Sequence, residues 1–116
     1  MAHTFQEKKM TQTTLYPAWQ EVIQYSDAGP NPQKIIETDN FRAVIVGLNA
    51  GQKIPSHPAP ASTYHFFAGT GSIIVNGERF AVQAGTTVVV PDGATRSIEA
   101  ETKLAFLGAQ AAQINQ

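Results

Sequence analysis

The sequence predicts an all-β domain, and three observations carry this prediction. From residue 34 onward the chain consists of short runs rich in Val, Ile, Thr and Phe, the residue types that favour strands. Glycine, proline or Asn-Gly separates these runs at intervals of roughly 8–12 residues, which is typical of a sandwich or small barrel. No run is long and periodic enough to predict a convincing helix there. The 116 residues correspond to one domain, since an ordinary domain has about 100–150.

The expected strands follow one another along the chain with clear breaks. They cover residues 34–38, 42–48, 63–68, 72–75, 79–84, 86–90, 96–100 and 103–109. Asn76-Gly77 predicts a type I′ hairpin, because both central positions of this turn need a positive φ. Gly85 and Pro91 bound the run 86–90. Its continuous Thr and Val residues predict a strand that is buried along most of its length.

The N-terminal part of the chain has a different pattern. Trp19, Val22 and Ile23 lie at i, i+3 and i+4, which predicts a short N-terminal helical segment lying against the sheet. Two prolines and a glycine within residues 29–32 end it. We expect residues 1–14 to be a flexible extension and residues 15–116 to form the single domain.

Composition excludes several classes of function. The eight basic and nine acidic residues are interspersed, so no basic stripe predicts nucleic-acid binding. No apolar run reaches the roughly 18 residues of a membrane span, and we expect a soluble, cytoplasmic protein without membrane partners. The chain has no cysteine, which excludes a thiol nucleophile, disulfides and thiolate zinc.

Two segments carry glycine and proline at spacings known from one family. The first has Gly51, then His57 after five residues, then Ala59, with Gly69 and Gly71 further on. The second has Gly85, then after five residues Pro91, Asp92 and Gly93, and after two more residues Arg96. Together they resemble the two cupin motifs. In the first motif a glycine precedes a His-x-His pair, a glutamate and a second glycine. In the second motif a glycine precedes Pro-x-Gly and a histidine. The resemblance covers residues 25–109.

The resemblance implies a double-stranded β-helix, the cupin jelly roll, that forms a homodimer. In this family the lumen holds a divalent metal on three histidines and one carboxylate. His57 matches the first histidine, whereas Ala59 and Arg96 stand where two others would be, and the glutamate position falls on Ser62 or Tyr64. Alanine has no donor atom and arginine cannot be deprotonated. We therefore expect no cofactor and no metal, with a divalent metal as the alternative.

That alternative is a slipped site in which His57 and His65 share the metal. Ser62, Tyr64 and Phe66 alternate along one expected strand, so they should face the lumen together while His65 faces the other way. A bulge would be needed to turn His65 inward.

Arg96 is the most informative of these substitutions. Its fork of donors suits a carboxylate or phosphate ligand; the alternative is an ion pair with Asp92 or Glu99 at the rim of the barrel. With His57, Ser62, Tyr64 and Phe66, Arg96 completes the candidate ligand-binding set.

These residues favour a metal-independent protein that binds a small organic molecule, including an anionic one, in its lumen. One alternative is an enzyme, either dioxygenase-like with a rearranged metal site or a metal-free sugar or small-molecule isomerase or epimerase with His57 as the catalytic base. Another is a structural or interaction role, with the pocket filled by Tyr64, Phe66 and Phe67.

Overall fold

A computed structural model describes residues 12–112 of the chain. Residues 1–11 of the predicted extension lie outside the described residues. A 3-10 turn, η1 (Trp19–Glu21), precedes the strands, which are β1 (Gln33–Glu37), β2 (Phe41–Leu48), β3 (Lys53–Pro58), β4 (Ser62–Ala68), β5 (Thr70–Val75), β6 (Glu78–Gln83), β7 (Thr87–Val90), β8 (Thr95–Ala100) and β9 (Leu104–Ala111).

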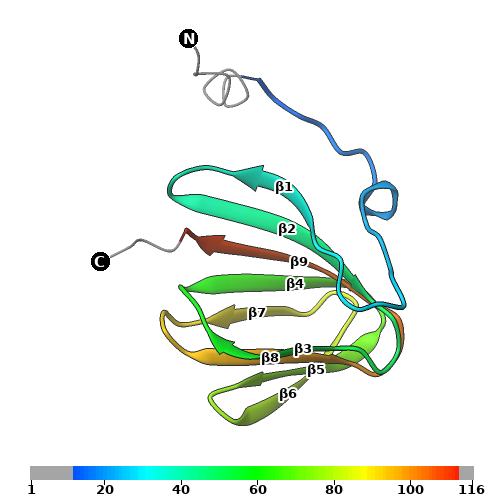
Figure 1. Cartoon of the computed structure of the whole chain (residues 1–116), viewed down its shortest axis with the longest axis vertical. Helices are drawn as coiled ribbons and strands as arrows, with labels where there is room; N and C mark the ends of the chain where they lie inside the picture. The colour runs from blue at the N-terminus through cyan, green and yellow to red at the C-terminus, as the bar shows by residue number, and fades with distance from the viewer. Residues whose placement is uncertain (1–11, 113–116) are drawn as a thin grey trace.

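The strands form two antiparallel sheets that face each other. One sheet has the order β1-β2-β9-β4-β7 and the other β3-β8-β5-β6, and Figure 1 shows the two layers with the N-terminal segment running outside them. Successive strands alternate between the sheets over much of the chain, as in a jelly roll. The predicted all-β sandwich is confirmed. The described part of the chain contains no helix with the length and hydropathy of a membrane span.

The local structure differs from the prediction at two places. The helical segment is only the single 3-10 turn η1, in which the Trp19 carbonyl accepts hydrogen bonds from the amides of Val22 and Ile23, both at 3.0 Å. No side chain caps its first residue, and β-branched residues favour a helix weakly. The strand β3 was not predicted, because Pro55 and Pro58 lie within it; as an edge strand it tolerates the missing amide hydrogens.

The prediction that residues 86–90 are buried along most of their length was also wrong. It forms β7, an edge strand, and the side chain of Val89 is 72% exposed. Only the alternate residues Val88 and Val90 turn towards the other sheet. The hairpin prediction is confirmed, since Asn76 has φ 50° and Gly77 has φ 84° between β5 and β6.

The core lies between the two sheets and is built by alternation along the strands. Phe66 on β4 and Phe106 on β9 are fully buried, with ring centroids 5.2 Å apart. On the outer side of the same sheet, Trp19 stacks on Phe67 with centroids 5.2 Å apart. The segment before β1 therefore covers part of this outer face.

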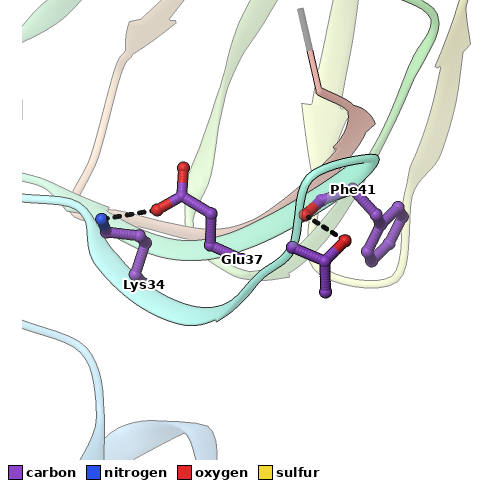
Figure 2. Close-up of polar contacts among 4 residues, drawn as sticks. Lys34, Glu37 and Phe41 are labelled. Carbon is purple, nitrogen blue, oxygen red and sulfur yellow. Dashed lines mark hydrogen bonds and ion pairs between the residues drawn. The ribbon is translucent and has the colours of Figure 1, made fainter. Parts of the chain in front are cut away.

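The far edge of the larger sheet carries an ion pair next to exposed apolar side chains such as Ile36. On β1 the Lys34 ammonium lies 2.7 Å from the Glu37 carboxylate, and the Thr38 hydroxyl donates to the Phe41 carbonyl at 3.4 Å (Figure 2). Charged side chains on an edge strand discourage pairing with other chains. The ammonium holds the pKa of Glu37 below its usual range, through the hydrogen bond first and the charge second.

Candidate functional site

Arg96 is the largest fully buried side chain in the described part of the protein. It lies on β8 and shares with Ile98 and Ala100 the face of the strand that packs into the core. Its exposed fraction is 1%. An arginine is rarely buried to this degree without partners, so its contacts define the site.

The guanidinium donates hydrogen bonds to neutral oxygens on three segments of the chain, which are the β3–β4 loop, β4 and the β7–β8 loop. Two of them are side-chain hydroxyls of β4, which accept from Nη1: Ser62 Oγ at 2.7 Å and Tyr64 Oη at 3.2 Å. Four are backbone carbonyls: Pro60 with Nη1 at 3.3 Å, Ala59 and Pro91 with Nη2 at 3.0 and 3.4 Å, and Ala94 with Nε at 3.0 Å. We call Arg96 and these six oxygens the Arg96 cluster.

Neither predicted ion-pair partner of Arg96 is used. Glu99 instead lies 3.1 Å from Arg79 and 4.0 Å from Lys53 on the outer face of the smaller sheet. Asp92 forms no ion pair with any residue between 12 and 112. Among residues 12–112, therefore, only dipoles stabilise the positive charge of Arg96. A buried charge in this state favours the approach of an anion.

His57 is not brought into the Arg96 cluster. It pairs in register with Arg96 across β3 and β8, next to an irregularity between Ile54 and His57. Its side chain is exposed, and Nδ1 lies 2.9 Å from the Pro55 carbonyl. The structure thus places His57 on the edge strand rather than among the buried polar groups.

The other candidate residues divide as strand alternation predicted. Ser62, Tyr64 and Phe66 all face the interior, but Phe66 belongs to the apolar core, where it packs on Phe106. His65 faces outwards, where Nδ1 lies 2.7 Å from Thr87 Oγ1. The bulge that a metal shared by His57 and His65 would need is not present at His65, which pairs regularly with Thr87.

Phe67 also faces outwards, against Trp19 and the edge of the His65 ring. It was expected to fill the pocket together with Tyr64 and Phe66, and that expectation was wrong because Phe67 differs from them by one position of the alternation.

The interior residues do not fit the metal that the cupin resemblance implies. Within residues 12–112 no group of three or more His, Cys, Asp or Glu side chains could hold an ion. The guanidinium occupies the interior at the position of the last histidine and engages the nearby hydroxyls itself. Its fixed charge would repel a divalent cation at this place.

Sequence reasoning missed the backbone part of the site. The carbonyls of Ala59, Pro60, Pro91 and Ala94 come from the loops before β4 and before β8. The prolines were the available signal, because they stiffen both loops, but a carbonyl oxygen is present at every residue and carries no pattern.

Comparison with known proteins gives the fold. Neither a protein-family model nor a curated protein sequence matches the chain. A conserved protein of unknown function from Streptococcus pyogenes superposes with a TM-score of 0.78 at 16% identity, over 90% of this chain and 92% of that one. An RmlC-like cupin from Desulfovibrio desulfuricans gives 0.77 at 20% identity, over 86% and 97%. A predicted oxalate decarboxylase from Thermotoga maritima gives 0.66 at 19% identity, over 72% and 81%. The two-sheet topology and these likenesses together establish that the chain is a small cupin-fold protein.

Proposed function

We propose that this protein binds a small organic anion, a carboxylate in the first place, at Arg96 and without a metal. The observation that supports this is an arginine that is 1% exposed and whose guanidinium, in the part of the chain that the structure describes, contacts only neutral oxygens. A carboxylate would supply the missing negative charge, and its two oxygens match the fork of an arginine.

The two longest contacts mark where the anion would enter. Nη1 reaches the Pro60 carbonyl at 3.3 Å and Nη2 reaches the Pro91 carbonyl at 3.4 Å. Both carbonyls belong to residues between strands, in the β3–β4 and β7–β8 connections. A carboxylate that replaced these two acceptors would gain two charge-assisted hydrogen bonds, while the shorter contacts to Ser62 and Ala59 would keep the guanidinium in place.

The enzymatic alternative has less support from the geometry. His57, its expected base, is exposed on an edge strand, and its ring contact is to the Pro55 carbonyl. No carboxylate within the described chain orients the imidazole, as the ion pairs of that region involve Lys53, Arg79 and Glu99. Binding at Arg96 therefore explains more of the buried polar structure than catalysis at His57.

Ligand-observed NMR and titration calorimetry test the proposal with matched pairs of ligands. Acetate and benzoate should bind the wild type, whereas acetamide and benzamide, which have the same shape without the charge, should not. Arg96→Gln should weaken carboxylate binding at least tenfold. Arg79→Gln, which removes an exposed arginine, should leave it unchanged.

Equal binding of the acids and the amides to the wild type would overturn the proposal, and this comparison needs no variant. The same conclusion would follow if folded Arg96→Gln, verified by circular dichroism, bound carboxylates as well as the wild type. Loss of binding in Arg79→Gln instead would place the anion on the outer face of the smaller sheet.

A further inference from the structure

A slot opens between the two sheets along the edge formed by β6 and β7. The slot is a groove that is largely open to solvent, with a volume of about 560 Å³, and small-molecule sites have volumes of about 300–1,000 Å³. Its walls are mainly apolar and include Val75, Phe80, Val88 and Pro91. Glu78 is the one charged residue among the described residues that line it. We call this feature the β6–β7 slot.

The slot exposes residues that have the orientation of core residues. Glu78, Phe80 and Val82 alternate along β6 and share its inner face. Val82 is buried in the core, but Phe80 is 40% exposed. On the opposite wall Val88 packs only partly against the core. The interior of the sandwich is thus uncovered here, and an apolar molecule that entered the slot would remove this surface from water.

The inner end of the slot borders the Arg96 cluster. Val75 on β5 is the register partner of Arg96 on β8, so both side chains lie on the same face of the sheet. Pro91 lines the slot, and its carbonyl lies 3.4 Å from Nη2 of Arg96. Arg96 itself does not line the slot, but the Pro91 carbonyl lies between the two, so a ligand in the slot that displaced this carbonyl would reach the guanidinium with one end.

Glu78 lies one strand further along the same row. It is the register partner of Val75 across β5 and β6, which places Arg96, Val75 and Glu78 side by side on the inner face of three neighbouring strands. Adjacent strands are about 4.8 Å apart, so the backbones of Arg96 and Glu78 are separated by about 10 Å. Glu78 forms no ion pair in the part of the chain that the structure describes.

We infer that the β6–β7 slot holds the apolar body of a monocarboxylic acid whose carboxylate binds Arg96, and that Glu78 excludes acids with a second negative charge at the far end. This inference rests on the proposed function, since it takes Arg96 as the anion site. Arg96 at one end of this row is positively charged and Glu78 at the other end is negatively charged. The two ends of a bound ligand would therefore meet opposite charges. A dicarboxylate of matching length would bring its second group towards the Glu78 carboxylate and be repelled.

A series of acids on the full-length protein tests the slot separately from Arg96. Acetate reports on Arg96 alone, because it has no body to fill the slot. Hexanoate adds an apolar chain, and adipate adds a second carboxylate to a chain of the same length. We expect hexanoate to bind the wild type at least tenfold more tightly than acetate, and adipate at least tenfold more weakly than hexanoate.

Two variants assign these differences to residues. Phe80→Ala should weaken hexanoate at least fivefold and leave acetate unchanged, and Glu78→Gln should bring adipate to within threefold of hexanoate. Phe41→Ala is the matched control, since Phe41 on β2 is 42% exposed, like Phe80, but does not line the slot. It should change no affinity.

The outcomes separate the two proposals. If acetate binds through Arg96 but hexanoate binds no more tightly and Phe80→Ala changes nothing, the slot inference fails and the proposed function stands. If hexanoate binds equally well to wild type and Arg96→Gln, the proposed function fails, and the inference falls with it. Undiminished discrimination against adipate in Glu78→Gln would overturn the role of Glu78.

Discussion

Replacing Arg96 by methionine tests how much of the fold depends on the buried guanidinium. Methionine keeps an unbranched apolar chain in the core but has no donor. Four of the contacts of Arg96 are 3.2 Å or shorter, those with Ser62, Tyr64, Ala59 and Ala94. At a net contribution of about 1 kcal/mol each, their loss amounts to about 4 kcal/mol.

One effect opposes this loss. The buried charge disappears together with its hydrogen bonds, and a buried charge is costly in itself. We therefore expect Arg96→Met to lower the free energy of unfolding by about 2–4 kcal/mol. For a domain of this size, that is a decrease in Tm of about 10–20 °C.

Urea denaturation, followed by circular dichroism, measures the effect. Ser62→Ala removes the shortest of the contacts, at 2.7 Å, and should cost about 1–2 kcal/mol. Arg79→Met is the control, because its side chain is 58% exposed, and it should stay within about 0.5 kcal/mol of the wild type. If Arg96→Met unfolded at the same urea concentration as Arg79→Met, the Arg96 cluster would not stabilise the fold and the reasoning would be refuted.

Three other perturbations have defined outcomes. Gly69→Ala should lower the free energy of unfolding, measured in urea, by about 2 kcal/mol more than Gly85→Ala. Both glycines have a positive φ, 88° and 92°, but only at Gly69 would a Cβ overlap a backbone carbonyl. Equal losses of stability in the two variants would contradict this. The hydrogen bond from Arg79 lowers the pKa of Glu99 below the ordinary value of a glutamate. Glu99 therefore stabilises the fold at pH values above that ordinary value, and this contribution disappears as the pH falls through the lowered pKa. Arg79→Gln should therefore be less stable than wild type at pH 7 and equal to it at about pH 2, and a gap that persisted would be evidence against the ion pair. Elemental analysis of wild type and His57→Ala, purified without chelator or nickel, should find no stoichiometric metal in either; a metal lost only in the variant would show that His57 is a ligand.

Most strands could be predicted because their signals are local. The Asn76-Gly77 turn needs only the φ preference of two residues, and it was found at the predicted place. The common facing of Ser62, Tyr64 and Phe66 follows from the pleat of one strand. The strand β3 was missed for the same reason, since its two prolines are a local signal against a strand and only its place at the edge of the sheet makes them acceptable.

At the site, too, local signals could be predicted and tertiary contacts could not. The sequence indicated that Arg96 replaces a metal ligand, but it left open whether the guanidinium meets an acid, and the structure shows that it meets hydroxyls and carbonyls instead.

By itself, then, the sequence determined the all-β class, the hairpin, the facing of the β4 residues and the chemistry that Arg96 can perform. Only the tertiary structure decided which oxygens surround Arg96, that His57 stays on the exposed edge strand, and that β6 and β7 leave a slot between the sheets. The physical reason is that strand periodicity and turn preferences act between neighbours in the chain. The contact between Arg96 and Ala59, by contrast, joins residues 37 positions apart through a backbone group that every residue has.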